Sequence, residues 1–91
     1  MLSFIETKLF TRLVAEYLTE SEYISLQDAL EVNPEAGKVV AGSGGVRKLR
    51  WAPPGRGKSG GYRVIYFVQR EPGVIVMLTL YAKNVKDNIP G

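Results

Sequence analysis

Hydrophobic residues in the first third of the chain recur with helical spacing. A short apolar run at residues 2–5 predicts a strand. Apolar residues then return every three or four positions over 9–18 and again over 23–30, which predicts two helices. The side chains expected to face inward are Leu9, Phe10, Leu13, Val14, Tyr17, Leu18, Tyr23, Leu26 and Leu30.

Polar residues mark the ends of both predicted helices. Thr7 is placed to cap the first helix. Thr19 and Glu22 have the T-x-x-E spacing of a capping box at the start of the second. Pro34 disfavours helix at Asn33, so the second helix is expected to end there.

The hydrophobic period changes to two after the glycine-rich run at 41–45. In the strand predicted at 46–52, Leu49 and Trp51 share one face, whereas Lys48 and Arg50 share the other. Since Leu49 and Trp51 form the apolar face, Trp51 is interpreted as core rather than as a platform for base stacking. Further strands are predicted at 62–69 and 74–82, joined by a turn at 70–73.

The order of these elements, β-α-α-β-β-β, indicates an α+β fold class. We expect one domain over residues 1–91, with a twisted, mainly antiparallel sheet and a helical hairpin on one face. The last strand is apolar on both faces, as expected of a covered strand inside the sheet.

Composition narrows the possible chemistry. The chain has 91 residues, 45% of them hydrophobic, which fits a globular domain. It has no cysteine and no histidine, so acid–base chemistry would depend on Lys, Arg, Tyr or carboxylates. We expect no metal and no other cofactor. No apolar run is long enough to span a membrane, and the first residues lack the basic start of a signal peptide, so a cytoplasmic protein is expected.

The net charge of +3 conceals a division along the chain. Residues 1–38 carry three basic and seven acidic side chains, a net charge of −4. Residues 39–91 carry nine basic and two acidic side chains, a net charge of +7. Six of those basic residues lie between Arg47 and Arg63 with no acidic residue among them. This concentration favours a polyanionic partner, although a solvated face can carry the same charges.

The segment 52–59, A-P-P-G-R-G-K-S, resembles a relaxed phosphate-binding loop. A nucleotide-binding loop of that kind must be followed by a helix, and here two glycines and a strand follow, so we reject it. A glycine-rich loop that carries Arg56 and Lys58 can still hold a phosphodiester backbone.

Basic and phenolic residues of three strands are expected to share the sheet face away from the helices. Lys48 and Arg50 lie in this phase on one strand, Arg63 near the start of the next, and Tyr81 with Lys83 at the end of the last. Neighbouring cations favour the neutral lysine that a base requires, and guanidinium groups can stabilise a charged phosphorus centre. The same arrangement also describes a groove that binds RNA without cutting it, and spacing alone leaves both possibilities open.

Three runs of sequence carry a family resemblance. They are 44–50 (GGVRKLR), 57–66 (GKSGGYRVIY) and 78–84 (LTLYAKN), in that order. Together they resemble the RelE/ParE superfamily of toxins, and the HigB-like branch in particular. The resemblance covers nearly the whole chain and implies a RelE-like fold.

The resemblance implies a function and partners. It implies a type II toxin that enters the ribosomal A site and cleaves mRNA there without a metal, by attack of the 2′-hydroxyl on the adjacent phosphorus. A HigA-like helix-turn-helix antitoxin would hold it inactive. Matching positions suggest Arg63 as the transition-state arginine, Lys58 as the proton-transfer group and Lys83 as a second candidate for that role. The RNA-contacting candidates are Arg56, Lys48, Arg50, Arg47 and Tyr81.

The sequence departs from the family pattern near its end. Asn84 stands where the RelE branch has a second catalytic arginine, and the late tyrosine of that branch has no counterpart. Family members typically continue past the equivalent of 89–91 into a C-terminal helix, so we expect exposed apolar surface here that lowers stability or leads to self-association. Two other functions stay open: a ParE-like inhibitor of gyrase, which would share the fold, and a non-catalytic RNA-binding module.

Overall fold

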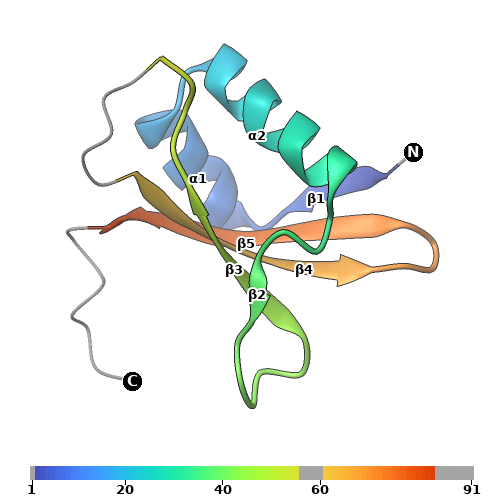
Figure 1. The fold of residues 1–91 in the computed structure, drawn as a ribbon. Helices are drawn as coiled ribbons and strands as arrows, with labels where there is room; N and C mark the ends of the chain where they lie inside the picture. Colours follow the sequence, from blue (N-terminus) through green and yellow to red (C-terminus); the bar gives the residue numbers. More distant parts are fainter. Residues whose placement is uncertain (1, 56–60, 84–91) are drawn as a thin grey trace.

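The computed structural model describes residues 2–55 and 61–83. It confirms an α+β fold with two helices and a five-stranded sheet (Figure 1). One strand, β2, was not predicted, because a two-residue strand leaves no periodic pattern in the sequence. The elements are β1 (Ser3–Glu6), α1 (Lys8–Tyr17), α2 (Glu20–Val32), β2 (Lys38–Val39), β3 (Val46–Trp51), β4 (Tyr62–Gln69) and β5 (Val74–Ala82).

The sheet is mixed but mostly antiparallel. Its strand order is β1-β5-β4-β3-β2, and every neighbouring pair is antiparallel except β1 with β5, which is parallel. The prediction that residues 74–82 form an interior strand is confirmed, because β5 lies between β1 and β4. The two edge positions are taken by the short strands β1 and β2.

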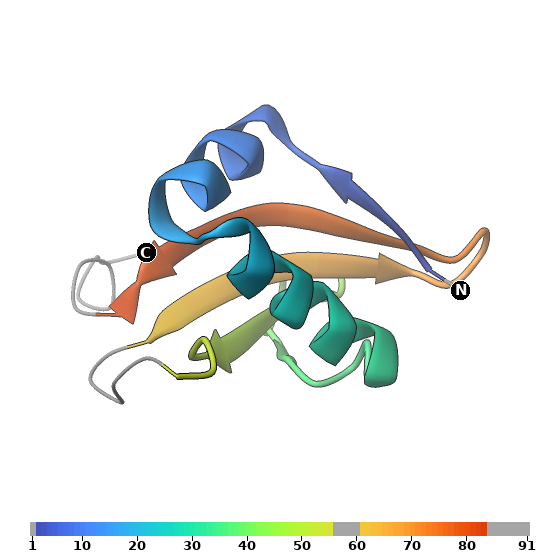
Figure 2. The same ribbon diagram turned by 90° about the horizontal axis from the view of Figure 1, so that it is seen from above.

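Both helices cover the same face of the sheet, as predicted. Figures 1 and 2 show α1 on the side of β1 and β5, and α2 on the side of β4 and β3. Both caps are formed: the Thr7 hydroxyl accepts from the Phe10 amide at 3.0 Å, and Thr19 and Glu22 make a complete capping box. Thr7 also donates to the Leu78 carbonyl at 2.8 Å, which ties the start of α1 to β5. The Asn33 cap ends α2 as expected.

The core lies between the helices and the sheet face that they cover. One inward prediction was wrong: Leu9 is 43% exposed, because α1 turns Phe10 and Val14 to the sheet and leaves Leu9 at the margin of its apolar stripe. Trp51 and Leu49 pack against the core, in agreement with the sequence analysis. The buried core side chains are Phe10, Val14, Leu18, Leu26, Leu30, Tyr62, Val64, Tyr66, Ile75, Met77 and Leu80.

Tyr66 fixes the chain segment that leads from α2 to β2. Its hydroxyl accepts from the buried Gly37 amide at 2.8 Å and donates to the Pro34 carbonyl at 2.8 Å. A Cβ on Gly37 would lie 2.9 Å from the Tyr66 ring, so this close approach requires glycine. The Arg47 guanidinium completes the anchor by donating to the Gly37 carbonyl at 2.7 Å. These contacts hold β2 against β3.

In the part of the chain that the structure describes, no helix is long and apolar enough to cross a membrane. The longer of its two helices, α2, has 13 residues. About 20 consecutive apolar residues are needed for a helical span.

Candidate nucleic-acid interface

The sheet face turned away from the helices, called here the far face, carries the candidate site. Residues directly opposite each other on neighbouring strands project to the same face, so the strand register defines rows of side chains across the sheet. The first of these, the arginine row, runs from Arg50 on β3 through Arg63 on β4 to Tyr81 on β5. Three residues that the sequence analysis assigned to one face are therefore consecutive members of a single cross-strand row.

Arg63 holds the centre of the arginine row. It is 8% exposed and is the one buried charged residue among residues 2–55 and 61–83. Arg50, directly opposite on β3, is exposed. A buried side chain has less rotamer freedom than an exposed one, which can adjust to a ligand. The row thus combines a fixed arginine with an adjustable one.

Two further rows continue along the far face. The lysine row places Lys38 on β2 opposite Lys48 on β3, which is itself opposite Ile65 on β4 and, through it, Thr79 on β5. The apolar row consists of Val46, Phe67, Val76 and Ile5. The far face is therefore cationic where β4 begins and apolar toward the opposite end of that strand.

Ile5 is the most exposed member of the apolar row, at 52%. Exposed apolar side chains in a contiguous row mark a surface that can take a partner. The self-association expected from the sequence stays a prediction.

Lys83 lies one position beyond β5 and is exposed. Its backbone N–H donates to the Gly61 carbonyl at 3.1 Å, so the ladder between β4 and β5 continues by one rung past Tyr81 and Ala82. The structure thereby places Lys83 at the end of the sheet where the arginine row lies. Arg56 and Lys58 fall outside the described residues, as does Asn84.

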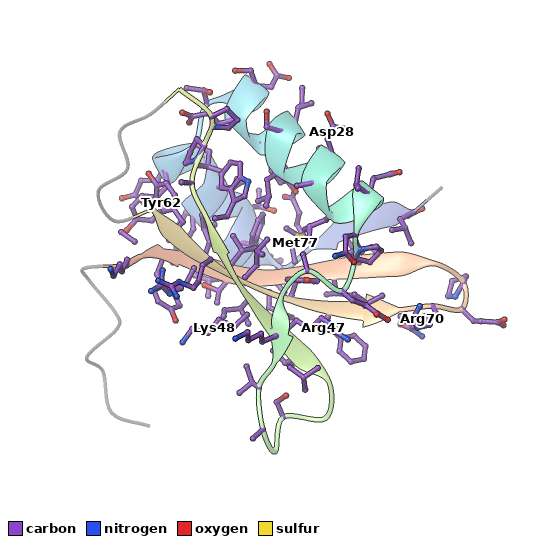
Figure 3. The ribbon with its side chains drawn as sticks, viewed as in Figure 1. Asp28, Arg47, Lys48, Tyr62, Arg70 and Met77 are labelled. Atoms are coloured by element: carbon purple, nitrogen blue, oxygen red, sulfur yellow. The ribbon has the colours of Figure 1, made fainter. Side chains whose placement is uncertain are left out.

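Arg47 is not brought to the far face. It is opposite Tyr66 in the register, on the helix-covered side, and its guanidinium donates to the carbonyls of Gly37 and Glu35 at 2.7 and 3.4 Å. Figure 3 labels Arg47 beside the segment that leaves α2, with Lys48 on the other side of β3. Arg47 is two positions before Leu49, so the alternation of the strand already places both side chains on the helix-covered face. The sequence therefore contained the information to exclude Arg47 from the far face.

A groove lies at the margin of the far face, where β2 begins beside β3. Its volume is about 420 Å³. Three exposed cations line it, Lys38, Lys48 and Arg50, so it opens directly from the arginine and lysine rows. Sequence reasoning missed Lys38, because β2 was not predicted and Lys38 was counted with the acidic half. The remaining lining residues are Ala36, Val39, Val40 and Leu49.

Acidic residues are separated from this face. None of the described acidic side chains lies on β2, β3, β4 or β5. They are found on β1, on the two helices, in the loop after α2 and in the turn between β4 and β5, and the loop residue Glu35 forms an ion pair with Arg70. Tertiary structure thus converts the charge division of the sequence into a cationic sheet face, which suits a phosphodiester chain.

The comparison with protein-family models agrees with this geometry. Residues 4–91 match the model of the RelE toxin of the RelE/RelB toxin–antitoxin system. The match covers both helices and all five strands except the first residue of β1. The mostly antiparallel sheet with two helices on one face is consistent with a RelE-like fold. The chain therefore belongs to the RelE toxin family, whose members act as the toxins of toxin–antitoxin systems.

Proposed function

We propose that the chain is a toxin of the HigB-like branch that cleaves translated mRNA on the ribosome and so arrests growth. The observation that carries the proposal is the arginine row. In this row the buried Arg63 lies between Arg50 and Tyr81. Among the described residues, the strands β2 to β5 that form this face carry no acidic side chain. A buried guanidinium aimed at a phosphodiester is preorganised to stabilise charge that develops on phosphorus.

The proposed reaction is an internal transesterification of RNA. A 2′-hydroxyl loses its proton and its oxygen bonds to the adjacent phosphorus. The bond from phosphorus to the 5′-oxygen breaks, and that oxygen takes up a proton. The products are a 2′,3′-cyclic phosphate and a 5′-hydroxyl. Arg63 would bind the non-bridging oxygens and gain strength as their charge rises toward the transition state.

Lysines are the proposed proton-transfer groups, since the sequence has no histidine. Lys58 is the first candidate from the family resemblance, and Lys83, at the end of the sheet beside the arginine row, is the second. The exposed Lys48 and Arg50 would hold the RNA backbone, together with Arg56 and Tyr81. The chemistry would need no divalent metal.

Partners follow from the same proposal. The substrate is mRNA in the A site of the ribosome, which implies action in the cytoplasm. The inhibitor is a HigA-like antitoxin with a helix-turn-helix domain. Contacts with RNA from the far face are expected to be strongly dependent on salt, because each phosphate that is neutralised releases counterions.

Primer extension on mRNA that is being translated tests the proposal. Purified chain added to a reconstituted translation reaction should produce new 5′ ends within the reading frame, and the same mRNA without ribosomes should stay intact. The cleaved ends should be a cyclic phosphate or 3′-phosphate and a 5′-hydroxyl, and 3′-hydroxyl ends would contradict the mechanism. Mg²⁺ cannot be removed to test whether the cleavage needs a metal, because ribosomes themselves require it. The chemistry of the cleaved ends is therefore the better readout.

A second arm separates the two rival functions. If the chain leaves mRNA intact but traps supercoiled DNA as a cleavage complex with gyrase, it is a gyrase inhibitor. If it binds RNA with a steep salt dependence and cleaves neither substrate, it is a binding module. Either result would replace the proposed function.

A further inference from the structure

The groove between β2 and β3 has two lysines on facing positions of the two strands. Lys38 and Lys48 are directly opposite each other in an antiparallel pair, and both are exposed. Like charges at such positions repel. The pairing between β2 and β3 has only two residue pairs, so this repulsion affects half of it. Packing alone would favour a neutral or acidic residue at position 38.

Arg50 brings a third cation to the same groove and connects it to the arginine row. It lines the groove and is also opposite Arg63. Lys48 and Arg50 are two positions apart on one strand, so their Cα atoms are separated by about 7 Å. That is comparable to the spacing of successive phosphates along an extended single strand of nucleic acid. The three cations therefore suit a chain of phosphates rather than one isolated anion.

The rest of the groove is apolar. Ala36, Val39, Val40 and Leu49 complete its lining, and its volume is about 420 Å³. Small-molecule sites in proteins begin at about 300 Å³, so one nucleotide fits. Cations beside an apolar wall match the two parts of a nucleotide, a charged phosphate and a base that prefers to leave water. An acidic peptide would pair with the cations but would make fewer contacts with the apolar wall.

We propose that this groove is a second RNA subsite, which holds a nucleotide adjacent to the one at the arginine row. In it Lys38 and Lys48 bind a backbone phosphate, and the exposed apolar side chains of Ala36 and Val40 contact the base or sugar. The RNA strand runs from Arg63 over Arg50 into the groove. This subsite depends on the proposed function only in taking the polyanion to be RNA, and it assigns a ligand-binding role to Lys38.

Substitution of Lys38 tests the subsite, because it should weaken RNA binding without lowering the stability of the fold. Lys38→Ala should weaken binding of a single-stranded oligoribonucleotide about three- to tenfold at physiological salt, and should lower the slope of log K against log salt by about 0.7. Lys38→Glu should weaken RNA binding further, yet its thermal midpoint should equal or exceed that of the parent, because the introduced carboxylate would pair with Lys48. Lys8→Ala is the matched control, because Lys8 is exposed on α1 and its loss changes the net charge by the same amount as Lys38→Ala.

Two RNA probes distinguish the source of the nucleotide. If Lys38→Ala weakens binding of the oligoribonucleotide, the groove holds the mRNA. If it weakens binding only to ribosomes without mRNA, the groove holds ribosomal RNA, which overturns the proposed path of the mRNA strand from Arg63 into the groove. The subsite is overturned if Lys38→Ala and Lys8→Ala bind both probes with the affinity and salt slope of the parent. It is also overturned if Lys38→Ala impairs only the binding of poly-L-glutamate, which would indicate an acidic protein as the occupant.

Cleavage is measured separately, so that the two proposals can fail independently. A parent chain that does not cut mRNA on ribosomes would refute the proposed function, whereas a Lys38 effect on RNA affinity would still support the subsite. Conversely, a parent that cleaves while the Lys38 variants bind RNA normally would refute the subsite alone.

Discussion

The two faces of strands β3 and β4 use the same residue types for different purposes. On the helix-covered face, Tyr66 is fully buried and its hydroxyl has both a donor and an acceptor. The cation on that face, Arg47, donates to backbone carbonyls and helps to hold the loop before β2. On the far face, Arg50 and Arg63 are opposite each other, and Lys48 is opposite Lys38. Arginine is thus a structural anchor on one face and part of a concentrated charge on the other.

This contrast shows which positions packing explains and which it does not. On the helix-covered side, the polar groups of Tyr66 and Arg47 satisfy backbone partners, which stabilises the fold. Pairs of like charges on facing positions of neighbouring strands destabilise the fold. Substitutions on the helix-covered face should therefore mainly lower stability. Substitutions on the far face should mainly lower RNA affinity or cleavage.

The largest effect is expected at Arg63. Arg63→Ala should lower the rate of mRNA cleavage on ribosomes by about 10²–10³-fold and abolish growth arrest, because a preorganised cation at the transition state is lost. Primer extension at matched protein concentration measures the rate. Thermal melting and antitoxin binding show whether the variant is folded.

Arg63→Lys is the matched variant for this prediction. It keeps the charge but loses the planar fork, so it should recover only a small part of the rate. A folded Arg63→Ala protein as active as the parent would remove Arg63 from the mechanism and leave the far face as a binding surface.

The next effect should fall mainly on stability. Tyr66→Phe leaves the buried Gly37 amide without its acceptor and the Pro34 carbonyl without its donor. It should lower the free energy of unfolding by about 1–3 kcal/mol, measured by urea denaturation. Cleavage per folded molecule should fall far less than in Arg63→Ala, because Arg63 keeps its position and Tyr66 acts only on the segment that leads to β2. A cleavage rate reduced as strongly as in Arg63→Ala would show that the two faces do not act separately.

Arg47 and Lys48 are adjacent on β3 but face opposite sides of the sheet. Arg47→Ala should lower the free energy of unfolding by about 1 kcal/mol, because the hydrogen bond to Gly37 is lost, with a small effect on RNA affinity. Lys48→Ala should lower RNA affinity and the salt slope without loss of stability, since its repulsion with Lys38 is removed. Filter binding over a salt series and thermal melting test both. If the two variants exchange these effects, the assignment of the faces is incorrect.

The smallest effect concerns alkaline pH. Burial raises the pKa of Tyr66 above its ordinary value of 10.0, against the opposing influence of the Gly37 amide and Arg47. The pKa of Tyr23 is also raised, first by burial and then by the carboxylate of Glu6, to which the Tyr23 hydroxyl donates at 2.6 Å. Both phenols therefore stay protonated in the folded chain at pH values where the unfolded chain ionises them. Their contribution to stability is complete below about pH 10 and is lost as the pH rises above it.

Urea denaturation between about pH 8 and about pH 11 measures this loss. The decline in unfolding free energy above pH 10 should be shallower in Tyr66→Phe and in Tyr23→Phe than in the parent. The same decline in all three proteins would mean that neither phenol contributes.

Local sequence patterns define the helix ends and the two long strands. The bounds predicted for β4 and β5 agree with the structure, and Thr7, Thr19 and Asn33 mark the helix ends as expected. These features depend on residues a few positions apart, whose spacing fixes which side chains share a face. The period of two also placed Lys48, Arg50 and Arg63 on the face away from the helices, and this is the part of the candidate site that could be predicted.

The way in which distant segments meet depends on the packing of the whole domain. The parallel pairing of β1 with β5, the short strand β2 and the groove lined by Lys38 depend on contacts between residues far apart in sequence. The clearest case is Tyr66, whose hydroxyl reaches back to Pro34 and Gly37 and so brings Lys38 opposite Lys48. No local period encodes such a contact, because its free energy is gained only when the helices and the sheet have packed together.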